Sequence, residues 1–182
     1  CLFQFLMSFQ VELSLINTSS VEKLEEEFGR CCGSPVWVQE MVKARPFANV
    51  DQLIEKGNLV WWNLSVEEWQ KAFAAHPKIG DRNAFRAKFS QHGWEGNEQS
   101  GTNTATEEVL EALEVLNNEY EYRNGFIFII CATGKSAVEM LTALKARVNN
   151  DSETEIQNAA GEQAKIIRLR LIKMLQSFTP SE

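Results

Sequence analysis

Apolar residues recur three or four positions apart along most of the chain. Val21, Leu24 and Phe28 have this spacing, and later segments repeat it. Such a period is typical of amphipathic helices that bury one face. Serine, threonine and proline residues suited to helix N-termini precede most of these segments. We expect helices to begin near Ser19, Pro35, Val50, Ser65, Thr104 or Thr106, Ala137 and Ser152. We also expect Gly57 to interrupt the third of these, Arg123-Asn124-Gly125 to end the fifth and Ser136 to cap the sixth.

One stretch breaks the helical pattern. Residues Phe126 to Ala132 are seven apolar residues in a row, and periodicity alone does not assign such a run. Because no second strand signal lies nearby, we expect an extended connector threaded through a helical core. Its backbone N–H and C=O groups then need partners, and a ligand rich in urea-like amides is one source of them. The predicted fold is all-α, a single-domain helical bundle with this extended connector and one long loop.

The long loop covers residues 81 to 103, which are rich in Gly, Asn, Ser, Gln and charged residues. Loops of this length are uncommon in compact domains and often functional. Glu98 suits a general base, an orienting group for His76 or an acceptor for substrate N–H groups, while Gln99 suits an amide partner. The structural alternative for Glu98 is a solvated loop carboxylate.

His76 lies where a helix is forced to stop. Pro77 disfavours the helical conformation in the preceding residue, so His76 falls at the C-terminal end of the helix that runs from Ser65 to Ala75. An imidazole held at a rigid corner suits proton transfer near neutral pH. The alternative is a histidine that caps the negative end of the helix.

Arg170 lies in the predicted final helix, from Ser152 to Phe178. Its position falls on the same stripe as Ile156 and Ile167, which draws it inward, whereas Arg168 faces elsewhere. An inward arginine in an acidic chain needs a partner, either Glu98 or an anionic substrate. The alternative is an arginine that extends to solvent from the flank of the helix.

Composition narrows the function further. The 182 residues carry 18 basic and 25 acidic side chains, a formal charge of −7, which argues against nucleic-acid binding. The four cysteines lack CxxC spacing, which favours free thiols in a reducing compartment and no metal site. Residues 1–15 are interpreted as an N-terminal extension whose apolar part is too short to span a membrane, and 179–182 as a tail.

Together these features resemble the family of decarboxylases that act on 2-oxo-4-hydroxy-4-carboxy-5-ureidoimidazoline (OHCU), an intermediate of urate degradation. The resemblance covers about residues 16–178. It is closest to the plant type, in which a transthyretin-like hydroxyisourate hydrolase domain commonly follows; that domain is absent from these residues. The motifs that carry it are Ala44-Arg45-Pro46-Phe47, His76-Pro77-Lys78-Ile79-Gly80, Glu98-Gln99-Ser100, Phe126 to Ala132 with Gly134-Lys135-Ser136, and Leu169-Arg170-Leu171.

The resemblance implies an all-helical carboxy-lyase, usually dimeric and free of cofactors, that converts OHCU to (S)-allantoin. The catalytic residues of the family fall on His76, Glu98 and Arg170. Its substrate contacts fall on Pro77, Gln99, Ile127, Phe128, Ile129, Ile130, Cys131 and Ala132. Glu95 stands where the family often has serine, and we include it among the candidate substrate contacts. The resemblance implies an intracellular protein, peroxisomal or cytoplasmic, although Thr179 to Glu182 is not a peroxisomal signal of the Ser-Lys-Leu type.

A different class of protein stays open beside the enzyme. The chain is alternatively a catalytically silent helical interaction module that keeps the family scaffold. The presence of His76, Glu98 and Arg170 together argues against it, and the departure at Glu95 favours it.

Overall fold

The computed structural model of the chain describes residues 11–78 and 100–178. The described regular elements are all helices, with no strand among them, which confirms the predicted all-α class. Contacts divide the chain into two compact units. The first unit combines residues 1–72 with 163–182, and the second comprises residues 73–162.

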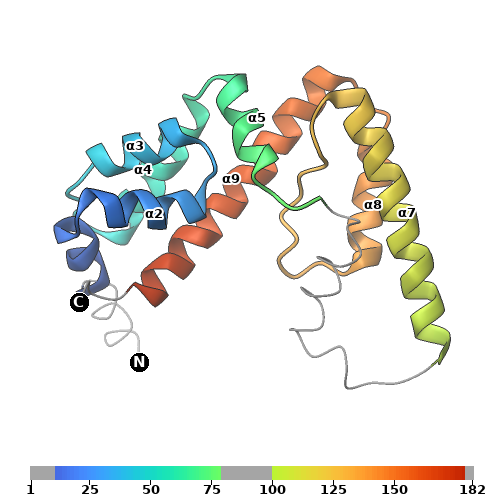
Figure 1. Cartoon of the computed structure of the whole chain (residues 1–182), viewed down its shortest axis with the longest axis horizontal. Coiled ribbons are helices and arrows are strands. Elements are labelled where there is room, and N and C mark those ends of the chain that lie inside the picture. The colour runs from blue at the N-terminus through green and yellow to red at the C-terminus, as the bar shows by residue number, and fades with distance from the viewer. Residues whose placement is uncertain (1–10, 79–99, 179–182) are drawn as a thin grey trace. The chain divides into compact units, whose positions relative to one another are not determined.

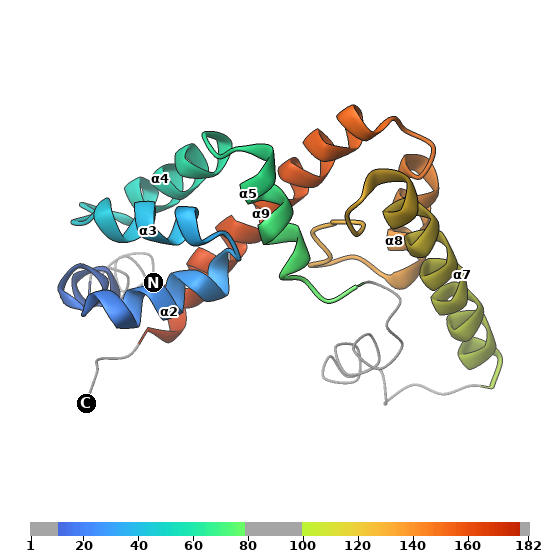
Figure 2. The same cartoon turned by 45° about the horizontal axis from the view of Figure 1, so that its top comes forward.

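The first unit is built from short helices of the N-terminal half and the last part of the chain (Figures 1 and 2). The helical residues 11–18 come first and bury Leu13 and Ile16. In these views and by their contacts, α2 packs against α3, and α3 packs against α4. The helices are α2 (Val21–Cys31), α3 (Pro35–Lys43), α4 (Val50–Trp62), most of α5 (Val66–Ala74) and the C-terminal part of α9 (Ser152–Ser177).

Side-chain caps begin these helices much as the sequence predicts. Ser34 accepts a hydrogen bond from the N–H of Trp37, and Pro35 occupies the first turn of α3. The cap of α2 is Ser20, one residue after the predicted Ser19. Each cap gives a partner to an N–H group that the first turn of a helix leaves free.

The core of the first unit is centred on Trp37, which is fully buried. Its ring packs edge-on against Phe28, with 5.9 Å between ring centroids. Its indole N–H donates to the C=O of Gly57 at 2.9 Å. A Cβ atom on Gly57 would lie 2.9 Å from Leu171 and 3.3 Å from Trp37. Gly57 therefore does not interrupt α4, as its place in the sequence suggested; it lets two other helices approach closely.

The second unit contains α7 (Ser100–Asn124), α8 (Ala137–Arg147) and the first part of α9. Ser136 and Glu139 form a reciprocal capping box at the start of α8. Gly125, with a φ of 77°, follows α7 and ends it where the sequence predicts. In contrast, α7 begins at Ser100, earlier than the predicted Thr104 or Thr106.

Residues 127–132 join α7 to α8 without regular secondary structure, as predicted for the extended connector (Figure 1). The side chains of Phe128, Ile129, Ile130 and Cys131 are all buried. The connector is therefore an irregular segment inside an apolar environment. Its peptide groups need partners other than a helix or a sheet.

The described cysteines are Cys31, Cys32 and Cys131, all buried free thiols, as the sequence predicts. Burial raises the pKa of both Cys31 and Cys32 to about 12, so these two thiols stay protonated. Among the described helices, none is long and apolar enough to cross a membrane.

We predict that replacement of Gly57 by alanine destabilises the first unit relative to the same replacement at Gly29. Alanine favours a helix over glycine by about 1 kcal/mol at both positions. A Cβ atom on Gly29 meets nothing within 4 Å, whereas one on Gly57 collides with Leu171. Urea unfolding should give Gly57→Ala a free energy of unfolding about 1 to 3 kcal/mol below that of Gly29→Ala. Equal values for the two variants would contradict the close packing.

Candidate active site

His76 lies directly after α5, as the sequence predicts. Its backbone N–H donates to the C=O of Phe73 at 3.1 Å, which makes one last turn beyond the helix end at Ala74. The His76 side chain is half-buried, and Pro77 follows it at the surface. Pro77 and the last turn after α5 therefore fix the position of the His76 backbone. The imidazole ring is partly accessible to solvent.

Two N–H groups of the connector are bound by side chains of neighbouring helices. The N–H of Phe128 donates to Oδ1 of Asn117 in α7 at 3.1 Å. The N–H of Cys131 donates to Oε2 of Glu162 in α9 at 2.7 Å. Asn117 is fully buried, so this amide replaces a partner that a sheet would otherwise provide.

Carbonyl groups of the connector are bound in the same way. Nη1 of Arg147, at the end of α8, donates to the C=O of Ile129 at 2.9 Å. Nζ of Lys135 donates to the C=O of Cys131, also at 2.9 Å. Both donors are cationic, and hydrogen bonds from charged donors are stronger than those between neutral groups. The connector is thus held by side chains at several consecutive peptide groups.

A buried ion pair fixes Arg147 in turn. Nη2 and Nε of Arg147 lie 2.8 and 2.9 Å from Oε2 of Glu155, whose side chain is fully buried. The hydroxyl of Tyr120 donates to the same carboxylate oxygen at 2.5 Å, and Asn150 and Asn158 donate to the other. Glu155 therefore has several donors in place of water, as a buried carboxylate requires.

The titration of this cluster follows from those contacts. Burial alone would raise the pKa of Glu155, but the hydrogen bonds from Arg147, Tyr120, Asn150 and Asn158 outweigh it and hold the pKa below its ordinary value of 4.5. Burial and the bond to Glu155 raise the pKa of the Tyr120 phenol. The carboxylate stays ionised and the phenol stays protonated near neutral pH, so the ion pair persists there.

Arg170 lies in the part of α9 that belongs to the first unit. Its Nη1 donates to the C=O groups of Arg30 and Cys31, at 3.2 and 3.5 Å. These carbonyls lie at the C-terminal end of α2, where a positive charge is favourable. Arg170 is half-buried and Arg168 is exposed, as the helical spacing predicts.

The described residues do not test whether the three predicted catalytic residues lie together. His76 belongs to the second unit and Arg170 to the first. Glu98, together with Glu95 and Gln99, lies outside the described residues. The expected partner of Arg170 was a carboxylate or a substrate, and its recorded partners are the carbonyls of α2. The convergence of these residues around one substrate stays a prediction.

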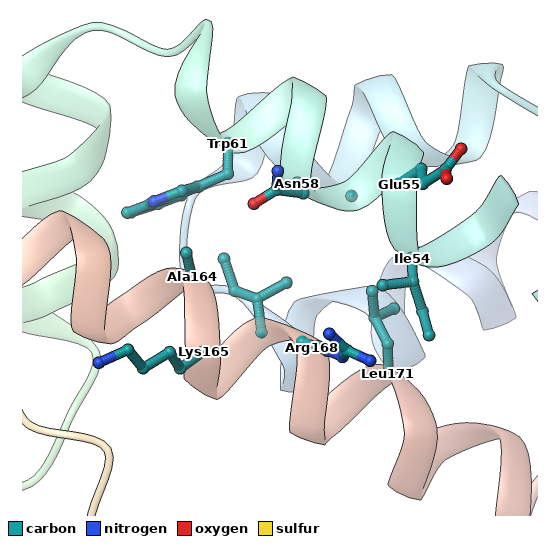
Figure 3. A pocket seen from close by; sticks show the side chains of 10 residues that line it. Ile54, Glu55, Asn58, Trp61, Ala164, Lys165, Arg168 and Leu171 are labelled. Carbon is teal, nitrogen blue, oxygen red and sulfur yellow. The ribbon is translucent and has the colours of Figure 1, made fainter. Parts of the chain in front are cut away.

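A pocket of about 360 Å³ lies in the first unit between α4 and α9 (Figure 3). Trp61 and Leu171 contribute apolar surface, while Glu55 and Arg168 contribute charge. None of the predicted site residues lines this pocket. No group of three or more histidine, cysteine or acidic residues suited to a metal ion occurs among the described residues.

The residues that hold the connector were not found by the sequence analysis. Asn117 lies on the buried stripe of α7, between Leu113 and Tyr120 at helical spacing. Glu155 starts a similar stripe in α9 that continues through Ala159. A polar residue on an otherwise buried stripe was the available signal, because such a group must be hydrogen-bonded when it is buried.

The structure is that of an all-α protein in which side chains of the surrounding helices hold a buried irregular segment, the connector. The chain belongs to the OHCU decarboxylase family, whose model matches residues 17–172. It is 35% identical over 153 residues to the uric acid degradation bifunctional protein TTL of Arabidopsis thaliana; the match covers 82% of this chain and 47% of that protein. The chain thus spans about half the length of this relative.

Two further relatives are matched over nearly their full length. A 2-oxo-4-hydroxy-4-carboxy-5-ureidoimidazoline decarboxylase of Xenopus laevis is 26% identical, with 88% of this chain and 93% of that protein covered. A crystal structure of OHCU decarboxylase in the presence of (S)-allantoin superposes with a TM-score of 0.68 and 33% identity, covering 84% of this chain and 99% of that one.

We predict that Glu155→Gln lowers the free energy of unfolding by about 3 to 5 kcal/mol near neutral pH, because it leaves the Arg147 side chain, which is only 14% exposed, without its countercharge. The folded-state pKa of Glu155 lies below 4.5, so its contribution is present above that pH and is lost as the pH falls through the folded pKa. The difference between wild type and variant should therefore narrow on acidification.

Denaturant unfolding at several pH values measures this difference, and Glu153→Gln serves as control because Glu153 is an exposed residue of the same helix. The control should stay close to wild type throughout. A loss for Glu155→Gln that is equal at neutral and acidic pH would contradict the role of the charge.

Proposed function

We propose that the chain decarboxylates OHCU to (S)-allantoin in urate degradation and needs no cofactor to do so. The observation that supports this activity is membership of the OHCU decarboxylase family over residues 17–172, which contain the motifs around His76, Glu98, the connector and Arg170. The relative solved in the presence of (S)-allantoin covers 84% of this chain. The presence of (S)-allantoin with that relative supports allantoin as the class of product.

The substrate itself supplies the chemistry that a cofactor otherwise provides. Loss of CO₂ from the carbon that bears the hydroxyl and carboxylate leaves an electron pair, and the adjacent ring C=N accepts it. The protein then has to orient the substrate, exclude water and move protons. Acid–base catalysis by one positioned side chain typically contributes about 10² to 10⁴ in rate, so binding geometry supplies the rest.

The proton carrier in this proposal is His76. The imidazole removes the proton of the 4-hydroxyl or returns a proton to the enol-like intermediate, while Glu98 fixes the histidine tautomer or the ligand. Its half-buried position after the proline corner is consistent with a ring that is both fixed and accessible. Delivery of the proton to one face explains a single enantiomer, because decay in water has no facial preference.

Substrate binding is assigned to charged and backbone groups. Arg170 holds a polar or anionic part of the substrate, and its Nη1 contacts with the end of α2 support a guanidinium held in one place. The connector from Ile127 to Ala132 contributes peptide groups. Pro77, Glu95 and Gln99 complete the set of proposed contacts.

The wider assembly is part of the same proposal. Relatives with which this chain is aligned over part of their length are named bifunctional proteins of uric acid degradation. This supports a native context in which a hydroxyisourate hydrolase domain is fused to or associated with the decarboxylase. We also propose a homodimer, and a peroxisomal or cytoplasmic location.

We predict that the protein accelerates the decay of OHCU and yields (S)-allantoin. OHCU is generated in place from urate by the two upstream enzymes, and circular dichroism follows the product. His76→Asn should reduce kcat by about 10² to 10⁴ through loss of proton transfer. His92→Asn, at the only other histidine of the sequence, is the matched control and should retain activity.

Two results would contradict the proposed function. One is unaltered decay of OHCU with a racemic product in the presence of the wild-type protein, which would favour the silent interaction module. The other is full activity and stereochemistry of His76→Asn, which would remove His76 from the mechanism.

A further inference from the structure

We propose that Arg147 and Glu162 are positioning residues for the decarboxylation, because they fix the orientation of the two peptide groups on either side of Ile130. This inference rests on the proposed function, in which the connector contacts the substrate. Both residues lie in the second unit with the connector, and their contacts with it are direct hydrogen bonds. Neither residue was among the candidates predicted from the sequence.

The peptide groups on either side of Ile130 have trans geometry. Among the described residues the only cis bond is Arg45–Pro46, so both peptide bonds of Ile130 are trans. In a trans peptide the C=O and N–H groups point in opposite directions. Arg147 binds the C=O of Ile129, so the N–H of Ile130 points away from Arg147. Glu162 binds the N–H of Cys131, so the C=O of Ile130 points away from Glu162.

The two anchors therefore leave one donor and one acceptor on the same residue. Within the described part of the chain, neither the N–H nor the C=O of Ile130 forms a hydrogen bond. Such a donor and acceptor pair complements an amide or ureido group, which offers one N–H and one C=O. The chemistry matches a substrate with a ureido substituent.

Several partners hold the guanidinium of Arg147 in one position. Its guanidinium carbon lies 4.6 Å from the ring centroid of Phe128 and 5.9 Å from that of Tyr120. The same guanidinium binds Glu155 through Nη2 and Nε and the connector through Nη1. Arg147 thus contacts the connector at two places, the C=O of Ile129 and the ring of Phe128. A planar fork of five donors can do this, and the single ammonium of lysine cannot.

We predict that Arg147→Lys raises the KM for OHCU and the Kd for (S)-allantoin at least ~10-fold, since a displacement near ~1 Å costs about 10²-fold. Arg123→Lys is the matched control. Arg123 also binds a backbone carbonyl in the second unit, that of Val148 at 3.0 Å, but it does not touch the connector. Steady-state kinetics and calorimetric titration with (S)-allantoin give the two constants, and melting temperatures report stability.

A second pair of variants tests the same inference without changing Arg147. Glu162→Gln keeps a carbonyl oxygen that can accept from Cys131, and Glu162→Ala removes the acceptor. The glutamine variant should retain a KM within about 3-fold of wild type, whereas the alanine variant should raise KM and Kd as Arg147→Lys does. If Arg147→Lys does not fold, this pair decides the matter.

The outcomes separate the two proposals. An active wild type with raised KM and Kd in Arg147→Lys and Glu162→Ala supports the positioning roles. An active wild type with unchanged KM and Kd in both variants, and only a lower melting temperature, overturns these roles and leaves the decarboxylase standing. A wild-type protein that neither accelerates OHCU decay nor binds (S)-allantoin overturns both proposals.

Discussion

The hydrogen bonding of a buried irregular segment is the constraint on which the second unit depends. The connector between α7 and α8 passes through an apolar environment, where each peptide group without a partner costs about 1 to 3 kcal/mol. A helix satisfies these groups internally and a sheet satisfies them between strands, but the connector has neither. Asn117, Arg147 and Glu162 provide the missing partners from three different helices or their ends. The position of the connector and the packing of these helices are therefore coupled.

The Arg147–Glu155 ion pair shows how polar groups are tolerated in such a place. A buried carboxylate is favourable only when its oxygens are filled with donors, and Glu155 accepts from an arginine, a phenol and two asparagines. The pair holds Arg147 in the position from which it binds the C=O of Ile129 in the connector. Such a buried ion pair can favour one conformation of the chain even where its net contribution to the free energy of folding is small. In the proposed function this rigidity matters, because peptide groups that bind a substrate have to be fixed in advance.

Much of the fold could be predicted from residue spacing and capping chemistry. The cap at Ser136, the helix end at Gly125 and the corner at Pro77 are local signals, and the structure has each of them where the sequence predicts it. The apolar run from Phe126 to Ala132 predicted an extended connector, because the sequence shows no second strand nearby that could pair with it. What failed depends on contacts distant in sequence. Gly57 was read as an interruption of a helix because its neighbours Trp37 and Leu171 come from other helices.

The candidate site shows the same division between local and distant information. The place of His76 follows from the residue next to it, whereas the partner of Arg170 does not follow from the spacing of α9. The sequence predicts Glu98 or an anionic substrate as the partner of Arg170, which stays a prediction; the contacts of Arg170 with the carbonyls of Arg30 and Cys31 were not predicted. Asn117, Arg147 and Glu162 were not predicted to bind the connector. A polar residue on a helix is interpreted as exposed to solvent unless the residues around it are known to be buried.

Amide hydrogen exchange measured by NMR tests the anchoring of the connector most directly. The N–H groups of Phe128 and Cys131 are bound to buried or half-buried side chains although they lie outside any helix. The account predicts that both exchange as slowly as interior amides of α7, such as that of Leu113. Exchange of Phe128 and Cys131 as fast as that of the exposed Gly134 would contradict it.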